Sequence, residues 1–174
     1  NYGDLQWNTK GRCSADTENA SVLLMSLSLP RESFLAITGV AWADGWMKKT
    51  EIAGLLRAAE ACGLSGEDLA AVEAATKQGV ELDSVDLSDM NGWERALTYA
   101  IANWLAKLDG VTNAQELKHL NALGSRLDLP KEKLAFAASA AFDIACLPDG
   151  HRPEKYDFDA LAVRLKEKLP SLAQ

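Results

Sequence analysis

The sequence contains an internal repeat, and this feature limits the possible folds more than any other. Shifted by 65 residues, positions 41–75 align with positions 106–140 without a gap, and ten of the 35 aligned positions are identical. The identities fall on an Asp-Gly turn, on the faces of the following helix and on the start of the helix after that. A repeat of this kind indicates a duplicated helical unit, which we expect to pack about a pseudo-two-fold axis.

Apolar residues recur at helical spacing through most of the chain. Capping signals mark helix starts at Ser65, at Asn91 with Glu94, and at Thr112 with Gln115. No run alternates apolar and polar residues long enough to predict a strand. The prediction is an all-α bundle of about seven helices built from a duplicated helical unit. The expected helices cover residues 31–43, 48–62, 65–77, 91–108, 113–127, 130–146 and 157–169.

The expected organisation is a polar N-terminal arm followed by one helical domain. Residues 1–20 carry no reliable periodicity and are assigned to the arm. Residues 21–174 are assigned to a single domain, with repeat halves at about 31–79 and 91–146 and a C-terminal helix at 157–169. A chain of 174 residues is long enough to bury one continuous core.

The charge balance argues against nucleic acid as a partner. The formal net charge is −7, from 25 acidic and 18 basic residues, and the basic residues form no run. An acidic surface instead favours divalent cations or basic protein surfaces. We therefore expect a protein partner, with the oligomeric state left open.

The apolar stretches and the cysteines indicate a soluble protein of a reducing compartment. The longest apolar run near the N-terminus, Ser21 to Leu29, is far shorter than the roughly 20 residues of a membrane-spanning helix. Direct membrane insertion is therefore not expected. Cys13, Cys62 and Cys146 are odd in number and widely separated, which predicts neither a disulfide framework nor a zinc site. The expected location is cytoplasmic.

Four carboxylates form the candidate metal site. Asp44 and Asp109 each precede a glycine at the end of a helix, and Glu51 and Glu116 each follow seven residues later, in the next helix. Carboxylate oxygens suit calcium or magnesium, so we hypothesise that each aspartate, alone or with its glutamate and backbone carbonyls at the helix end, contributes ligands for a divalent cation. The alternative interpretation needs no ion, because Asp-Gly is a good turn former and an early glutamate caps a helix.

The glycine-to-glutamate spacing also occurs in EF-hand loops, but the rest of that pattern is missing. Counting back from Gly45, positions one and three of such a loop would be Val40 and Trp42, which carry no oxygen ligand. An EF-hand is therefore excluded.

No catalytic motif is visible in the sequence. A nucleophile elbow, a His-Glu-x-x-His pair and a phosphate-binding loop are all missing. The expectation is that the protein is not an enzyme. The alternative function is a metal-dependent hydrolase that uses the same four carboxylates, which would require a pocket joining them.

Trp46 is the candidate partner-binding residue. It follows the first Asp-Gly turn, and four of the five tryptophans cluster near the ends of the two matching helices. Most large aromatic side chains are buried, so a core role is the competing interpretation. If Trp46 is exposed beside the acidic turn, it becomes an anchor for a protein partner, since tryptophan is enriched in interaction hot spots.

The duplicated turn resembles the TerB-like family, in which an alanine-rich helix ends in Ala-Asp-Gly and a glutamate opens the next helix. The matching segments are Ala43-Asp44-Gly45-Trp46-Met47 with Glu51, and Leu108-Asp109-Gly110-Val111-Thr112 with Glu116. The resemblance covers about residues 31–146. Bulky Trp46 and Met47 after the first glycine depart from the usual pattern.

The resemblance implies an all-α bundle, a role in bacterial stress response and tellurite resistance, and cation binding by the acidic positions. Together with the charge, it predicts a non-enzymatic acidic helical module for binding or scaffolding.

Overall fold

The computed structural model describes residues 27–110 and 112–173. Over these residues the protein has seven α-helices and no strand, which confirms the predicted fold class. None of these helices combines the length and the apolar character that crossing a membrane requires. The predicted arm, residues 1–20, lies outside the described residues. The helices are α2 (Arg31–Ala41), α3 (Lys49–Ala61), α4 (Gly66–Gln78), α5 (Gly92–Leu105), α6 (Ala114–Arg126), α7 (Lys131–Ala145) and α8 (Phe158–Lys168).

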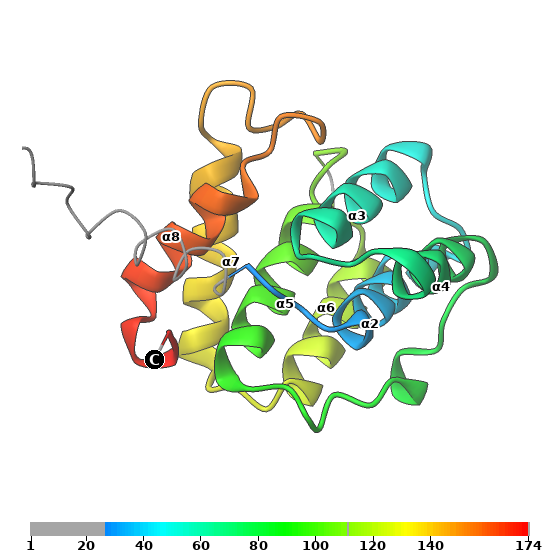
Figure 1. Ribbon diagram of the computed structural model, residues 1–174, viewed down its shortest axis with the longest axis horizontal. Coiled ribbons are helices and arrows are strands. Elements are labelled where there is room, and N and C mark those ends of the chain that lie inside the picture. Colours follow the sequence, from blue (N-terminus) through cyan, green and yellow to red (C-terminus); the bar gives the residue numbers. More distant parts are fainter. Residues whose placement is uncertain (1–26, 111, 174) are drawn as a thin grey trace, which may run out of the picture.

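Helix α5 occupies the middle of the bundle. In Figure 1, α7 and α8 lie on one side of α5, and α3 and α4 lie on the other. Helix α2 packs against α4, α5 and α6, while α7 packs against both α5 and α8. Three short 3-10 turns complete the helical structure, at Trp42–Asp44, Leu82–Ser84 and Pro170–Leu172.

The helix boundaries follow the 65-residue offset of the sequence repeat. Helix α3 spans residues 49–61 and α6 spans residues 114–126, so both ends differ by 65. Helices α4 and α7 begin at residues 66 and 131, which is the same offset. Gly45 and Gly110, at the two corners, have left-handed φ angles of 83° and 82°. The glycines of the two corners therefore share the left-handed conformation.

Equivalent residues of the two halves meet between α2 and α5. Ser33 and Thr98 differ by 65 in number and are both fully buried. The Thr98 hydroxyl donates to Ser33 Oγ at 3.0 Å. Since two equivalent positions touch only close to a symmetry axis, the pseudo-two-fold axis passes through this contact.

The capping pattern of α6 corrects one sequence prediction. Asn91 and Glu94 form the expected capping box at α5. At α6 the box is formed by Asn113 and Glu116, one residue later than the predicted Thr112 and Gln115. Asn113 has the extended backbone of an N-cap, and its amide oxygen accepts from the Glu116 N–H at 2.8 Å.

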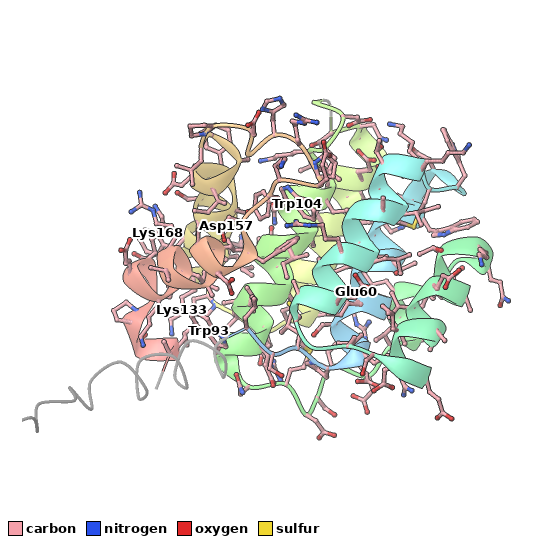
Figure 2. The ribbon with its side chains drawn as sticks, turned by 45° about the horizontal axis from the view of Figure 1, so that its top comes forward. Glu60, Trp93, Trp104, Lys133, Asp157 and Lys168 are labelled. Carbon is pink, nitrogen blue, oxygen red and sulfur yellow. The ribbon has the colours of Figure 1, made fainter. Side chains whose placement is uncertain are left out.

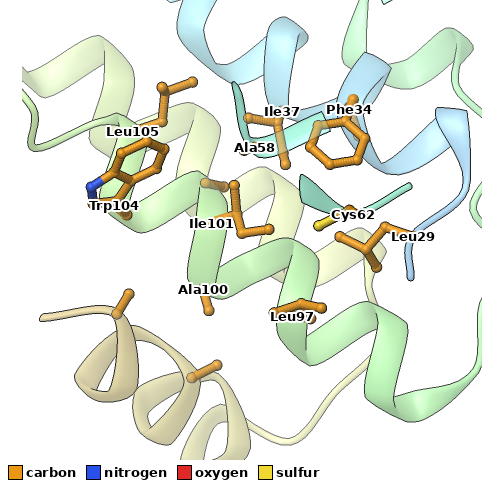
Figure 3. Close-up of a cluster of buried hydrophobic side chains, with 14 of the residues drawn as sticks. Leu29, Phe34, Ile37, Ala58, Cys62, Leu97, Ala100, Ile101, Trp104 and Leu105 are labelled. Carbon is orange, nitrogen blue, oxygen red and sulfur yellow. The ribbon is translucent and has the colours of Figure 1, made fainter. Parts of the chain in front are cut away.

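Apolar side chains from both halves form the core. In Figure 3, Phe34 and Ile37 of α2 face Leu97 and Ile101 of α5, with Ala58 of α3 beside them. All five are almost fully buried. Truncating one of the larger of these to alanine would cost about 2–5 kcal/mol of unfolding free energy.

Two arginines hold the connector between the halves, which is the segment 79–91 between α4 and α5. The guanidinium of Arg126 donates to Val85 O at 2.6 Å and contacts the Leu82 carbonyl. Arg95 donates to Met90 O and to Leu127 O, each at 2.8 Å. These bonds give partners to backbone carbonyls outside the α-helices, and they tie the connector to α5 and α6.

Candidate functional site

The two acidic corners lie together and exchange contacts across the pseudo-two-fold axis. Asn113 Nδ2 donates to Asp44 Oδ2 at 2.5 Å. In the equivalent position, the Lys48 ammonium donates to the Asp109 carboxylate. Each aspartate thus binds the residue that opens a helix of the other half. We name this group the corner cluster; it consists of Asp44, Lys48, Glu51, Asp109, Asn113 and Glu116.

The two glutamates form the buried part of the corner cluster. Each has only 4% of its surface exposed. Glu51 Oε2 accepts from the Lys48 backbone N–H at 2.7 Å, and Glu116 Oε2 accepts from the Asn113 backbone N–H at 2.9 Å. A carboxylate at this third helical position is stabilised by the free N–H groups and the helix dipole. Helix capping therefore accounts for one oxygen of each glutamate.

A very small cavity joins the two glutamates. It has a volume of about 10 Å³, and its remaining wall comes from α2, α5 and the residue that follows α5. The wall is symmetric, because its residues form four pairs separated by 65. These are Ile37 with Ala102, Val40 with Leu105, Ala41 with Ala106, and Glu51 with Glu116. A space of this size holds about one water molecule and no organic substrate.

The two helix starts in the cluster differ in one respect. At α6 the capping box is complete, because the Asn113 side chain accepts a bond and Glu116 accepts one in return. At α3 Lys48 occupies the equivalent position, and an ammonium group has no acceptor. The first half therefore has only the glutamate half of the box, and its lysine side chain turns to Asp109 instead.

The corner cluster has four carboxylates and one ammonium group, and three of the carboxylates act on that ammonium. The hydrogen bond to Asp109 raises the pKa of Lys48, and the charges of Asp109, Glu51 and Glu116 add to this rise. Burial raises the pKa of Glu51, and the Glu116 charge adds to the rise, while the Lys48 N–H and ammonium oppose it. Negative charge is therefore in excess at the axis.

The four predicted metal ligands belong to the corner cluster, but they divide into a buried pair and a surface pair. Glu51 and Glu116 are buried, whereas Asp44 and Asp109 lie at the surface. Within residues 27–110 and 112–173, no three His, Cys, Asp or Glu side chains are grouped closely enough to hold a metal ion.

Two members of the cluster were not predicted from the sequence. Asn113 could have been found, because it stands three residues before Glu116, the spacing of a capping box. Lys48 gave no such signal, since lysine is not a capping residue. Its role is apparent only once the opposite corner is in place.

Trp46 lies at the surface beside the cluster. Its side chain is 59% exposed, while Trp93 and Trp104 are buried. The next residue, Met47, is buried and anchors the turn to the core. Of the two interpretations of Trp46, the structure therefore supports the exposed one.

Comparison of the chain with protein-family models, curated proteins and solved structures found no match.

Proposed function

We propose that this protein is a non-enzymatic helical binding module that captures a protein partner with Trp46 and the acidic corner beside it. The observation that carries the proposal is the exposure of a tryptophan next to the corner cluster. An exposed indole buries a large apolar surface when a partner binds over it, which explains the enrichment of tryptophan in hot spots.

The turn that carries Trp46 is held from both sides. Gly45 takes the left-handed conformation, and Asp44 accepts a hydrogen bond from Asn113 of the other half. Met47 is buried directly after the tryptophan. A side chain presented by a fixed turn loses little backbone entropy on binding, which favours affinity.

The charge around Trp46 favours a basic partner segment. The chain carries a net charge of −7, and the corner cluster has four carboxylates for one ammonium. Lysine and arginine side chains can pack over an indole ring and also pair with carboxylates. We therefore propose a Lys/Arg-rich segment as the part of the partner that binds here.

A pull-down from the native host tests this proposal, with a synthetic Lys/Arg-rich peptide as a defined second probe. Trp46→Ala should reduce capture of both and leave the melting temperature unchanged. Leu117→Ala is the matched control, because Leu117 is also an exposed apolar residue, at 54%. Equal capture by the parent and the Trp46 variant, or a large loss of stability, would rule out this role.

We also propose that a divalent cation, calcium or magnesium, binds at the corner cluster and competes with Lys48. The support is the excess of carboxylates, which are the ligands these ions prefer. In this arrangement Lys48 is an internal cation at Asp109, so an incoming ion must displace it.

Isothermal titration with calcium and with magnesium tests the cation proposal. The parent should give a measurable heat, and the Glu51→Gln/Glu116→Gln double variant should give none. Lys48→Asn copies the residue of the second half and removes the competing ammonium, so it should bind the ion more tightly. Absence of heat from both the parent and Lys48→Asn ends the metal proposal.

The alternative of a metal-dependent hydrolase gains no support from the geometry. Its requirement was a pocket joining the four carboxylates, and the cavity beside Glu51 and Glu116 measures about 10 Å³. The TerB-like resemblance suggests a cytoplasmic role in bacterial stress response. A strain lacking the protein should then be more sensitive to tellurite than its parent.

A further inference from the structure

The helices of the two halves are spaced differently around equivalent residues of α2 and α5. In the first half α3 packs against α4, and Phe34 of α2 is fully buried. In the second half the backbones of α6 and α7 approach each other little, and Tyr99, the α5 counterpart of Phe34, is partly exposed. A cavity of about 670 Å³ lies here, lined by Tyr99 and by residues of α6 and α7. The second half is therefore open where the first half is closed.

This opening is one part of a longer groove. It adjoins a second cavity, of about 610 Å³, beside Trp104 at the C-terminal ends of α5 and α7, and Ala138 lines both. The groove follows α7 from Leu134 to Ala145, which is about three helical turns. Its α5 wall is a single helix face with residues four apart, namely Tyr99, Asn103 and Lys107. We name the two cavities together the α5–α7 groove.

The α7 wall of the groove is apolar where α4 is charged. The first half has a cavity of the same volume beside Trp42, so the halves differ there in lining and not in size. On α4, Lys77 Nζ pairs with Glu73 Oε1 at 2.9 Å. The α7 residues at these two positions are Phe142 and Ala138, and Phe142 is 58% exposed. An exposed apolar surface in place of a solvated ion pair is typical of a site that a partner covers.

The groove is also less acidic than the equivalent surface of the first half. Ser125 lines it at the position of Glu60, an exposed residue of α3 that Figure 2 labels. Lys107 and Lys131 line it at positions where the first half has uncharged residues. Neither ammonium pairs with any residue that the structure describes. The carboxylates that line the groove are Asp109, which is paired with Lys48, and Asp128. Two ammonium groups are thus available at the groove, although the chain has a net charge of −7.

From these differences we propose that the α5–α7 groove binds an amphipathic helix of a partner protein, with apolar residues on one face and acidic residues beside them. The apolar side chains pack on Phe142 and on the alanines of α7, and the flanking carboxylates lie toward Lys107 and Lys131. This is helix-in-groove recognition, with anchors three and four residues apart. Because the groove extends over about three turns, a helix fills it, whereas a small molecule fills one of its two cavities.

The groove is distinct from the surface proposed above for a Lys/Arg-rich segment. Trp46 lines neither of the two cavities, and the two surfaces prefer opposite charges. Trp46→Ala should therefore leave binding of the acidic helix unchanged. This variant separates a failure of one proposal from a failure of the other.

The test measures binding of a labelled synthetic peptide by fluorescence anisotropy. The peptide has about 14 residues, with leucines at helical spacing on one face and glutamates on the other. One control peptide has the same composition with the leucines scattered, and a second has lysines in place of the glutamates. The expected dissociation constant is below about 100 μM for the amphipathic acidic peptide, with at least about tenfold weaker binding of both controls. No binding of the acidic peptide, or equal binding of all three, overturns the proposal.

Variants of α7 locate the binding surface. Ala138→Glu/Phe142→Lys copies the ion pair of α4 and should abolish binding. Phe142→Ala should weaken it about tenfold, while Phe136→Ala should leave it unchanged, because Phe136 is exposed at 40% and lines neither cavity. If the double variant fails to fold, the comparison of Phe142→Ala with Phe136→Ala still decides. Equal effects of these two single variants contradict the proposed surface.

The charge preference and a competing occupant are tested last. Lys107→Gln/Lys131→Gln should weaken the acidic peptide about threefold at low salt, and added salt should remove the difference. Sedimentation of the protein alone tests whether a second copy occupies the groove. A dimer that Phe142→Ala dissociates, or an unchanged affinity in the double lysine variant, would overturn the assignment of an acidic partner helix.

Discussion

The two halves of this protein agree at their shared axis and differ at their outer surfaces. At the axis, Ser33 meets Thr98 and Glu51 meets Glu116, so equivalent residues keep similar tasks. Away from the axis, each half has a cavity of about 610 Å³ at the equivalent place, but the first half lines it with Trp42, whose indole N–H donates to Thr76 O, and the second half lines it with the exposed Lys107. Contacts between the halves therefore restrain change at the buried positions next to the axis, and the exposed positions differ more.

The largest expected effect tests this contrast directly. Trp42→Ala should lower the free energy of unfolding by about 2 kcal/mol, because it removes a half-buried ring and a hydrogen bond. Lys107→Ala, at the equivalent position, should change it by less than about 0.5 kcal/mol. Urea unfolding of both variants measures the difference. Equal losses of unfolding free energy would mean that the two positions contribute equally to stability, which contradicts the contrast.

The next effect concerns the two helix starts in the corner cluster. Asn113→Ala should cost about 1 kcal/mol, since it removes the cap of α6 and the bond to Asp44. Lys48→Ala removes only a partly exposed ion pair and should cost less than about 0.5 kcal/mol. Added salt should reduce the Lys48 effect and leave the Asn113 effect in place. A Lys48 variant as unstable as the Asn113 variant contradicts this ranking.

A smaller effect is expected where the halves place different residues in one backbone conformation. Gly63 ends α3 with a φ of 91°, and its counterpart Asp128 follows α6 with a φ of 49°. The left-handed region is costly for a residue with a Cβ. Asp128→Gly should therefore raise the unfolding free energy by about 0.5 kcal/mol, and Gly63→Asp should lower it by a similar amount. Thermal unfolding of the two variants is sufficient, and a stabilised Gly63→Asp would contradict the explanation.

The smallest effect is a pH dependence at Glu51. Its pKa is raised in the folded protein, so the folded state binds this proton more tightly than the unfolded chain does. Stability from this group is therefore present in acid and falls as the pH rises past about 4.5. Glu51→Gln should remove that fall, so the stability of this variant relative to the parent should rise as the pH is raised from about 4 to about 7. Denaturant titrations across this range, with Glu116→Gln as the matched variant, would show it as diverging curves.

The fold could be predicted from the sequence because helix signals are local. The spacing of apolar residues, the Asp-Gly turns and the repeat lie within a few residues of the structures they specify. The error at the start of α6 has the same origin, since Thr112 and Asn113 are both capping residues and each precedes a glutamine or glutamate by three positions. Which of the two residues caps α6 depends on where the backbone enters the helix. That residue is Asn113, and the Thr112 hydroxyl donates to Ala106 O instead.

The site was less predictable because its contacts join residues far apart in the chain. The aspartates and glutamates were found as corner residues, but the pairing of Asp109 with Lys48 spans 61 positions. A repeat predicts that two corners are alike and says nothing of which groups face each other across them. The cavity beside Trp104 could not be predicted from the sequence for the same reason, since its walls come from α5, α7 and two turns.

The hydrogen bond between Ser33 and Thr98 has a consequence for how such a molecule assembles. Because like residues face each other there, the joining surface is the kind that two identical subunits use in a symmetric dimer. Here a single polypeptide carries both partners, and the connector fastened by Arg95 and Arg126 keeps them at high effective concentration. Pairing is thereby independent of dilution, so the protein stays assembled at abundances at which a separate dimer would dissociate.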